Sequence, residues 1–117
     1  MPTIRDVVEA LGRREGVEAV IILGSDGLPI DSKTGNGKDP EVLSALVPNV
    51  IQAADQLGQH AGQGPLTMGV IQNDGGFVVI ANLSPEVKLL IVAKSGTNVG
   101  PLLYDLTRHR AEIAGLL

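Results

Sequence analysis

The sequence predicts an α/β (α+β) sandwich in which one five-stranded antiparallel sheet carries helices on both faces. Three observations predict this fold. Helix and strand signals follow one another along residues 1–117 in the order α-β-β-α-β-β-β-α, with no shift of composition that would divide the chain into two domains. The segments 17–23, 77–83 and 87–93 are nearly continuous apolar runs, which is typical of strands covered on both faces. Residues 39–64 form a long helical pattern almost without charge.

The first helix has a clear start signal. Thr3 opens the sequence Thr-Ile-Arg-Asp, which resembles a capping box with aspartate in the usual place of glutamate. Apolar residues then recur on one side at Ile4, Val7 and Leu11. We expect this helix to end near residues 12–16, which contain two glycines.

The first two strands form a predicted hairpin. The apolar strand at residues 17–23 leads into Asp26-Gly27, a dipeptide that favours tight hairpin turns. The returning strand covers residues 28–32 and contains Pro29. Proline has no backbone N–H to donate to a neighbouring strand, so this strand should lie at an edge of the sheet.

A loop at residues 34–38 precedes the central helix, which we expect to begin at Asp39 as N-cap with Pro40 in the first turn. Between residues 42 and 64 the only formally charged side chain is Asp55. Pro48 lies inside the pattern, where it removes a helical hydrogen bond. We therefore expect a kink at Pro48, or a short helix followed by a longer one.

The second half of the chain supplies three more strands. Residues 66–72 contain Gly69, which suggests an edge strand or a close backbone approach. The sequence Asn-Asp-Gly-Gly at 73–76 is the strongest hairpin signal in the chain, and it leads into the apolar strands 77–83 and 87–93. The second and third strands thus look like edges, and the first, fourth and fifth look central.

The last helix should cover residues 99–113, with Thr97 or Asn98 as its cap. A five-stranded sheet is about 24 Å wide and one helix is about 10 Å across. The first and last helices together can cover one face, whereas the central helix alone cannot cover the other. A homodimer that brings two central helices together would cover it. On the central helix, its predicted interface comprises Leu43, Leu46, Val47, Val50, Ile51, Ala54 and Leu57.

Composition excludes several classes of function. The net charge is −4, and Phe77 and Tyr104 are the only aromatic residues, so the chain lacks the basic surface and stacking rings of a nucleic-acid-binding protein. It has no cysteine for disulfides or thiolate metal sites. No apolar run has the length of a membrane span and no signal peptide is evident, so we expect a cytoplasmic protein without membrane insertion.

No motif predicts catalysis, a cofactor or a metal. Gly37 and Lys38 lack the following Ser or Thr and the upstream glycine of a phosphate-binding loop. His60 and His109 have no carboxylate at ligand or triad spacing. Ser25 lies in a hairpin turn rather than a nucleophile elbow.

Basic residues in the first and last helices could form one patch for an acidic partner if these helices lie side by side. A solvated helix face is the alternative explanation. The residues concerned are Arg13, Arg14, Arg108 and Arg110.

The hairpin sequence at residues 16–30, the charge-poor central helix and the turn at 73–76 together resemble the roadblock/dynein light-chain domain family over essentially the whole chain. The resemblance implies an α/β sandwich similar to profilin and longin domains. It also implies dimers formed through the central helix and the third strand, with a continuous ten-stranded sheet. The resemblance thus adds Leu66, Met68 and Val70 to the predicted interface. In bacteria such proteins commonly accompany small Ras-like GTPases, and the gliding-motility member acts as a GTPase activator without inserting an arginine finger.

The resemblance therefore implies a non-enzymatic homodimeric adaptor that binds a small Ras-like GTPase and modulates its hydrolysis or localisation. Two alternatives remain open at this point. One is a structural dimerisation subunit of a larger motor or signalling complex. The other is a small-ligand-sensing domain, since related sandwiches can hold ligands.

Overall fold

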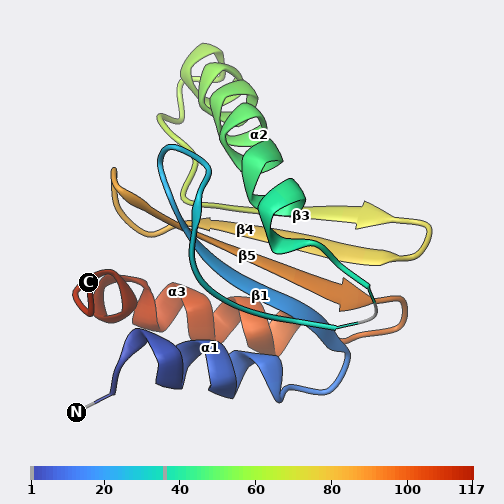
Figure 1. Cartoon of the computed structure of the whole chain (residues 1–117). Coiled ribbons are helices and arrows are strands. Elements are labelled where there is room, and N and C mark those ends of the chain that lie inside the picture. Colours follow the sequence, from blue (N-terminus) through green and yellow to red (C-terminus); the bar gives the residue numbers. More distant parts are fainter. Residues whose placement is uncertain (1, 36) are drawn as a thin grey trace.

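The computed structural model describes residues 2–35 and 37–117, and its helices and strands follow the predicted order (Figure 1). Asn36, in the predicted loop at 34–38, lies outside the described residues. The elements are α1 (Ile4–Gly12), β1 (Val17–Gly24), β2 (Pro29–Thr34), α2 (Pro40–His60), β3 (Met68–Asn73), β4 (Gly76–Asn82), β5 (Val87–Lys94) and α3 (Gly100–Ala114).

The strands form one antiparallel sheet in the order β2-β1-β5-β4-β3. This order confirms that β2 and β3 are the edges and that β1, β4 and β5 are central. The middle of the sheet is the pairing of β1 with β5, in which Ile21 lies opposite Leu90. Both residues are almost completely buried, as expected for strands covered on both faces.

The helices form two layers, one on each face of the sheet. Figure 1 shows α1 and α3 side by side on one face and α2 on the other. Two cores result. Val8 and Leu11 of α1 pack with Leu102 and Leu106 of α3 on the first face. On the second face, Val47 and Ile51 of α2 pack against strand residues that include Leu90. The predicted division of the helices between the two faces is confirmed.

The helix start signals at Thr3 and Asp39 are confirmed. The Thr3 hydroxyl accepts from the Asp6 amide at 3.2 Å, and the Asp6 carboxylate accepts from the Thr3 amide at 2.9 Å, which completes the capping box. Asp39 caps α2 by accepting from the Glu41 amide at 3.0 Å, with Pro40 in the first turn.

Of the two outcomes expected at Pro48, a short helix followed by a longer one is wrong, because α2 is one helix of 21 residues. A kink at Pro48 stays a prediction. The turn of α2 at Pro48 packs against the β1–β2 hairpin. A Cβ on Gly27, which has a φ of +83°, would lie 3.3 Å from Pro48 Cγ and 3.4 Å from the Ser44 carbonyl oxygen. Pro48 deprives that carbonyl of its helical donor, so tertiary packing here outweighs the local cost of proline.

Some predicted boundaries also shift. The second strand starts and ends later than predicted, at Pro29–Thr34, and the third covers Met68–Asn73. Neither predicted residue is the N-cap of α3, which is Val99 without a side-chain cap. Asn98 lies one position earlier, and its side-chain oxygen accepts from the Gly100 amide at 3.3 Å. Within residues 2–35 and 37–117, no helix has the length and apolar character needed to cross a bilayer.

Candidate protein-interaction surface

The outer side of α2 carries a stripe of apolar residues in solvent. Residues spaced by three or four positions lie within an arc of about 80° on a helix that turns about 100° per residue. The exposed fractions are 57% for Val42, 56% for Leu46, 37% for Val50 and 73% for Leu57. We call these four residues the α2 stripe. Because Val47 and Ile51 are buried against the sheet, α2 has two apolar sides and its own sheet covers only one of them.

The β3 edge of the sheet is also exposed and apolar. Val70 and Ile71 are 42% and 40% exposed, and Met68–Asn73 contains no charged residue. Ile71 lies opposite Val78, which packs against the α2-side core, so Ile71 points to the same face of the sheet as α2. The α2 stripe and the β3 end of this face are therefore two apolar surfaces that the chain itself leaves uncovered.

A hydrogen-bonded cluster joins α2 to the segment before β3. The Asp55 carboxylate accepts from the Leu66 amide at 2.7 Å, and Asn82 donates from its side chain to the Leu66 carbonyl at 3.2 Å. The Lys88 ammonium, which is 8% exposed, donates to the Asn82 side-chain oxygen at 2.6 Å and to the Ser84 carbonyl at 2.7 Å. Burial lowers the pKa of Lys88. The cluster fixes the entry into β3 relative to α2.

The structure divides the predicted interface residues into three groups. Leu46, Val50 and Leu57 are exposed on the α2 stripe. Val70 is exposed on β3, but it lies opposite Val79 of the α1–α3 core and so points to the other face of the sheet. Val47 and Ile51 belong to the intramolecular core under α2, with Leu43 and Leu66 half-buried beside them. Ala54 is half-buried, and Met68 packs against the core on the opposite face of the sheet.

Two exposed residues were missing from the prediction, although signals for them exist in the sequence. Val42 lies on the same helical side as Leu46, at a spacing of four. Ile71 is the only β3 side chain that adds a large apolar group to the α2 face, and the alternation of strand residues identifies it. Asp55 is the only formally charged side chain between residues 42 and 64, a signal that could have pointed to its role in the cluster.

The predicted basic residues have different surroundings in the α1–α3 layer. Arg14 forms an ion pair with Asp105, and Arg13 is exposed. The Arg108 guanidinium lies 5.5 Å from the centre of the Tyr104 ring. Arg110 donates from Nε to the Asn82 carbonyl at 2.8 Å. Arg108 and Arg110 are two residues apart in α3 and point about 200° apart around the helix.

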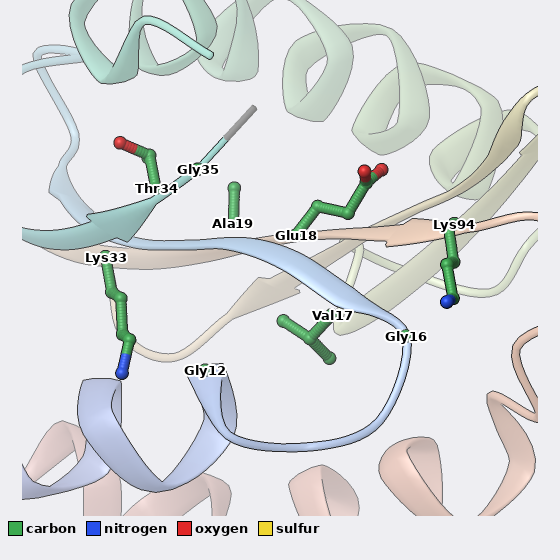
Figure 2. Close-up of a pocket in the computed structure, with 9 residues that line it drawn as sticks. All are labelled: Gly12, Gly16, Val17, Glu18, Ala19, Lys33, Thr34, Gly35 and Lys94. Atoms are coloured by element: carbon green, nitrogen blue, oxygen red, sulfur yellow. The ribbon is translucent and has the colours of Figure 1, made fainter. Parts of the chain in front are cut away.

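The described residues also line a polar hollow at the start of β1, with a volume of about 330 Å³. Figure 2 shows Glu18 and Thr34 on one side of the sheet and Lys33 and Lys94 on the other, so these groups do not converge. Lys33 donates to Glu9 at 3.0 Å. Across the described part of the chain, no three His, Cys, Asp or Glu residues are placed to hold a metal ion.

The fold and these surfaces define a mixed α/β sandwich domain with an exposed apolar helix stripe and an open apolar sheet edge. The model of the Roadblock/LC7 domain family matches residues 3–93. The chain belongs to this family.

Among known proteins, the chain is 23% identical over 110 residues to the uncharacterized protein MJ1340 of Methanocaldococcus jannaschii, covering 94% of this chain and 96% of that protein. Among solved structures, it is similar to MglB in a tetrameric arrangement, with a TM-score of 0.86, 16% identity, and coverage of 97% and 86% of the two chains. It is also similar to Myxococcus xanthus MglB, with a TM-score of 0.85, 16% identity, and coverage of 97% and 93%.

Proposed function

We propose that the chain is a non-enzymatic adaptor that forms a homodimer through α2 and β3 and binds a small Ras-like GTPase, modulating its hydrolysis or localisation. The proposal is carried by two exposed apolar surfaces, the α2 stripe and the open, uncharged β3 edge. Large apolar side chains gathered on one face of a small domain mark a protein-interaction site. An unpaired apolar edge strand is itself a template for pairing with another chain.

A second copy is the occupant that fits both surfaces together. Two β3 strands related by a two-fold axis can pair antiparallel, which would join the two sheets into one of ten strands. The same rotation brings the two α2 stripes onto one face of that joined sheet. Leu46 and Val50 would then be covered by the partner's helix, and the β3 end of the face would lie beneath both helices.

The GTPase partner rests on family membership and on the resemblance of the hairpin and central helix described above. The tetrameric MglB structure shows that a protein of this fold self-associates. Arg108 is exposed beside Tyr104 on α3, which lies on the opposite face of the sheet from α2. A dimer formed through α2 and β3 would therefore leave the α3 surface available for a further protein.

The test begins with the mass of the purified chain in solution, measured by light scattering. A dimer supports the proposal, and a monomer at all concentrations refutes its first half. A pull-down from the native host then compares samples with a GTP analogue and with GDP, read by mass spectrometry. A Ras-like GTPase in either sample supports the partner. Recovery of other proteins without any GTPase would refute the proposed GTPase partner and favour a structural subunit of a larger complex.

A further inference from the structure

The two edges of the sheet differ in how their outward backbone groups are satisfied. In an antiparallel pair, successive residues of an edge strand point their N–H and C=O groups alternately toward the partner strand and away from it. Gly35 donates to the Glu18 carbonyl of the β1 side at 3.1 Å, which sets this alternation for β2. The backbone N–H and C=O groups of Lys33 and Asp31 therefore point toward β1, and those of Ser32, in the middle of the edge, point away from the sheet.

Both outward groups of Ser32 are closed by side chains. The Ser32 amide donates to Asp31 Oδ1 at 2.8 Å, and Arg5 of α1 donates from Nη1 to the Ser32 carbonyl at 3.1 Å. The same Arg5 nitrogen donates to Asp31 Oδ1 at 2.8 Å, so the two blocking side chains hold each other in place. A second strand that approached β2 would meet an ion pair instead of a free donor and acceptor.

The β3 edge has no such block. Asn82 donates to the Thr67 carbonyl at 2.9 Å, so the backbone groups of Met68, Val70 and Gln72 point away from β4. In the part of the chain that the structure describes, no side chain forms a hydrogen bond to these groups. The β2 edge also carries an exposed apolar side chain, because Ile30 is 50% exposed. This side chain would favour pairing at β2 if Arg5 and Asp31 did not occupy the backbone groups of Ser32.

We propose that Arg5 and Asp31 determine which edge of the sheet associates, closing β2 so that self-association goes only through β3. This inference rests on the proposed β3-mediated dimer. A β3–β3 contact is two-fold and closes on itself, whereas a β2–β3 contact is head-to-tail and leaves a free edge at each end. With an open β2, each dimer would add further copies. Arg5 and Asp31 thus limit the assembly to a closed dimer.

The test compares two double variants that leave the net charge unchanged. Arg5→Ala with Asp31→Ala opens the backbone groups of Ser32. The control, Arg14→Ala with Asp105→Ala, removes an ion pair of the α1–α3 layer that involves neither Arg5 nor Asp31, so Ser32 stays closed. Sedimentation velocity over a wide range of concentration should show the weight-average mass of the first variant rising about twofold or more above wild type. The control should stay at the wild-type mass. Equal masses for both variants and wild type would overturn the proposal.

Adding Val70→Pro to Arg5→Ala and Asp31→Ala identifies the pairing. The Val70 amide points outward, so proline removes an edge donor without breaking the β3–β4 ladder. Loss of the large species shows head-to-tail β2–β3 growth, and their persistence contradicts it. If the double variant does not fold, Arg5→Ala alone carries the test, because the Arg5 side chain is 52% exposed. Val70→Pro alone tests the proposed β3-mediated dimer. If this variant keeps the wild-type mass in sedimentation, the dimer through β3 is refuted, whereas the effect of Arg5 and Asp31 on the β2 edge is judged from the double variants.

Discussion

Truncation of Leu46 tests the proposed dimer without disturbing the fold of the monomer. Leu46 is 56% exposed in the single chain, and this exposed area is what a partner would cover. Leu46→Ala removes about three carbon groups worth ~0.8 kcal/mol each when fully buried, of which roughly half is gained on dimerisation. Two symmetric copies lose about 2.4 kcal/mol together, which corresponds to a dimer dissociation constant about 50-fold higher.

Sedimentation equilibrium over a range of concentration measures this dissociation constant. Gln52→Ala is the matched control, because Gln52 is exposed on α2 but lies about 120° around the helix from Leu46. The control should keep the wild-type constant, and both variants should keep the wild-type unfolding midpoint within the scatter of the measurement. A dissociation constant for Leu46→Ala no higher than that of Gln52→Ala would refute the reasoning and place the interface elsewhere.

Three further predictions concern the fold. Gly76→Ala should lower the free energy of unfolding, measured in urea, by more than about 2 kcal/mol, since its Cβ would lie 2.2 Å from the Ala93 carbonyl oxygen at a φ of +149°. A Cβ on Gly75 would have no atom within 4 Å, so Gly75→Ala should change this free energy by less than about 1 kcal/mol. Lys88→Ala leaves Asn82 without its donor and should cost about 2 kcal/mol in the same assay. Hydrogen bonds from Lys33 and Arg5 lower the pKa of Glu9. The Glu9 carboxylate therefore stabilises the fold at pH values above the ordinary carboxyl pKa, and this stabilisation is lost as the pH falls through the lowered pKa. An NMR titration of Lys33→Ala should show a higher Glu9 pKa than in the wild type.

The order of elements and the layers were predictable because local signals agreed with the final packing. Thr3 and Asp39 cap helices in the structure as their sequences predict. Pro29 marked β2 as an edge, and the order of strands confirms it. Pro48 shows the limit of this reasoning, because a local rule gives the cost of proline but not the hairpin at Gly27 that packs against its turn.

The candidate surface was predictable only in part, for a geometric reason. Periodicity identified α2 as a helix apolar on more than one side, but it could not tell which side meets the chain's own sheet. The structure assigns Val47 and Ile51 to that inner side and leaves Leu46 in solvent. The contacts of Arg5 with Ser32 join residues 27 positions apart, and no local pattern connects them.

The central position of β5 has a consequence for how the protein acquires its structure. The chain can form β1–β2 and β3–β4 early as separate hairpins, since each joins neighbouring segments. Nothing pairs these hairpins with each other until β5, the last strand, enters between β1 and β4. The inner edges of both hairpins therefore stay open during synthesis until Val87–Lys94 has left the ribosome. Folding of the sheet is completed by a late insertion, and this is the stage at which a nascent chain is most exposed to aggregation.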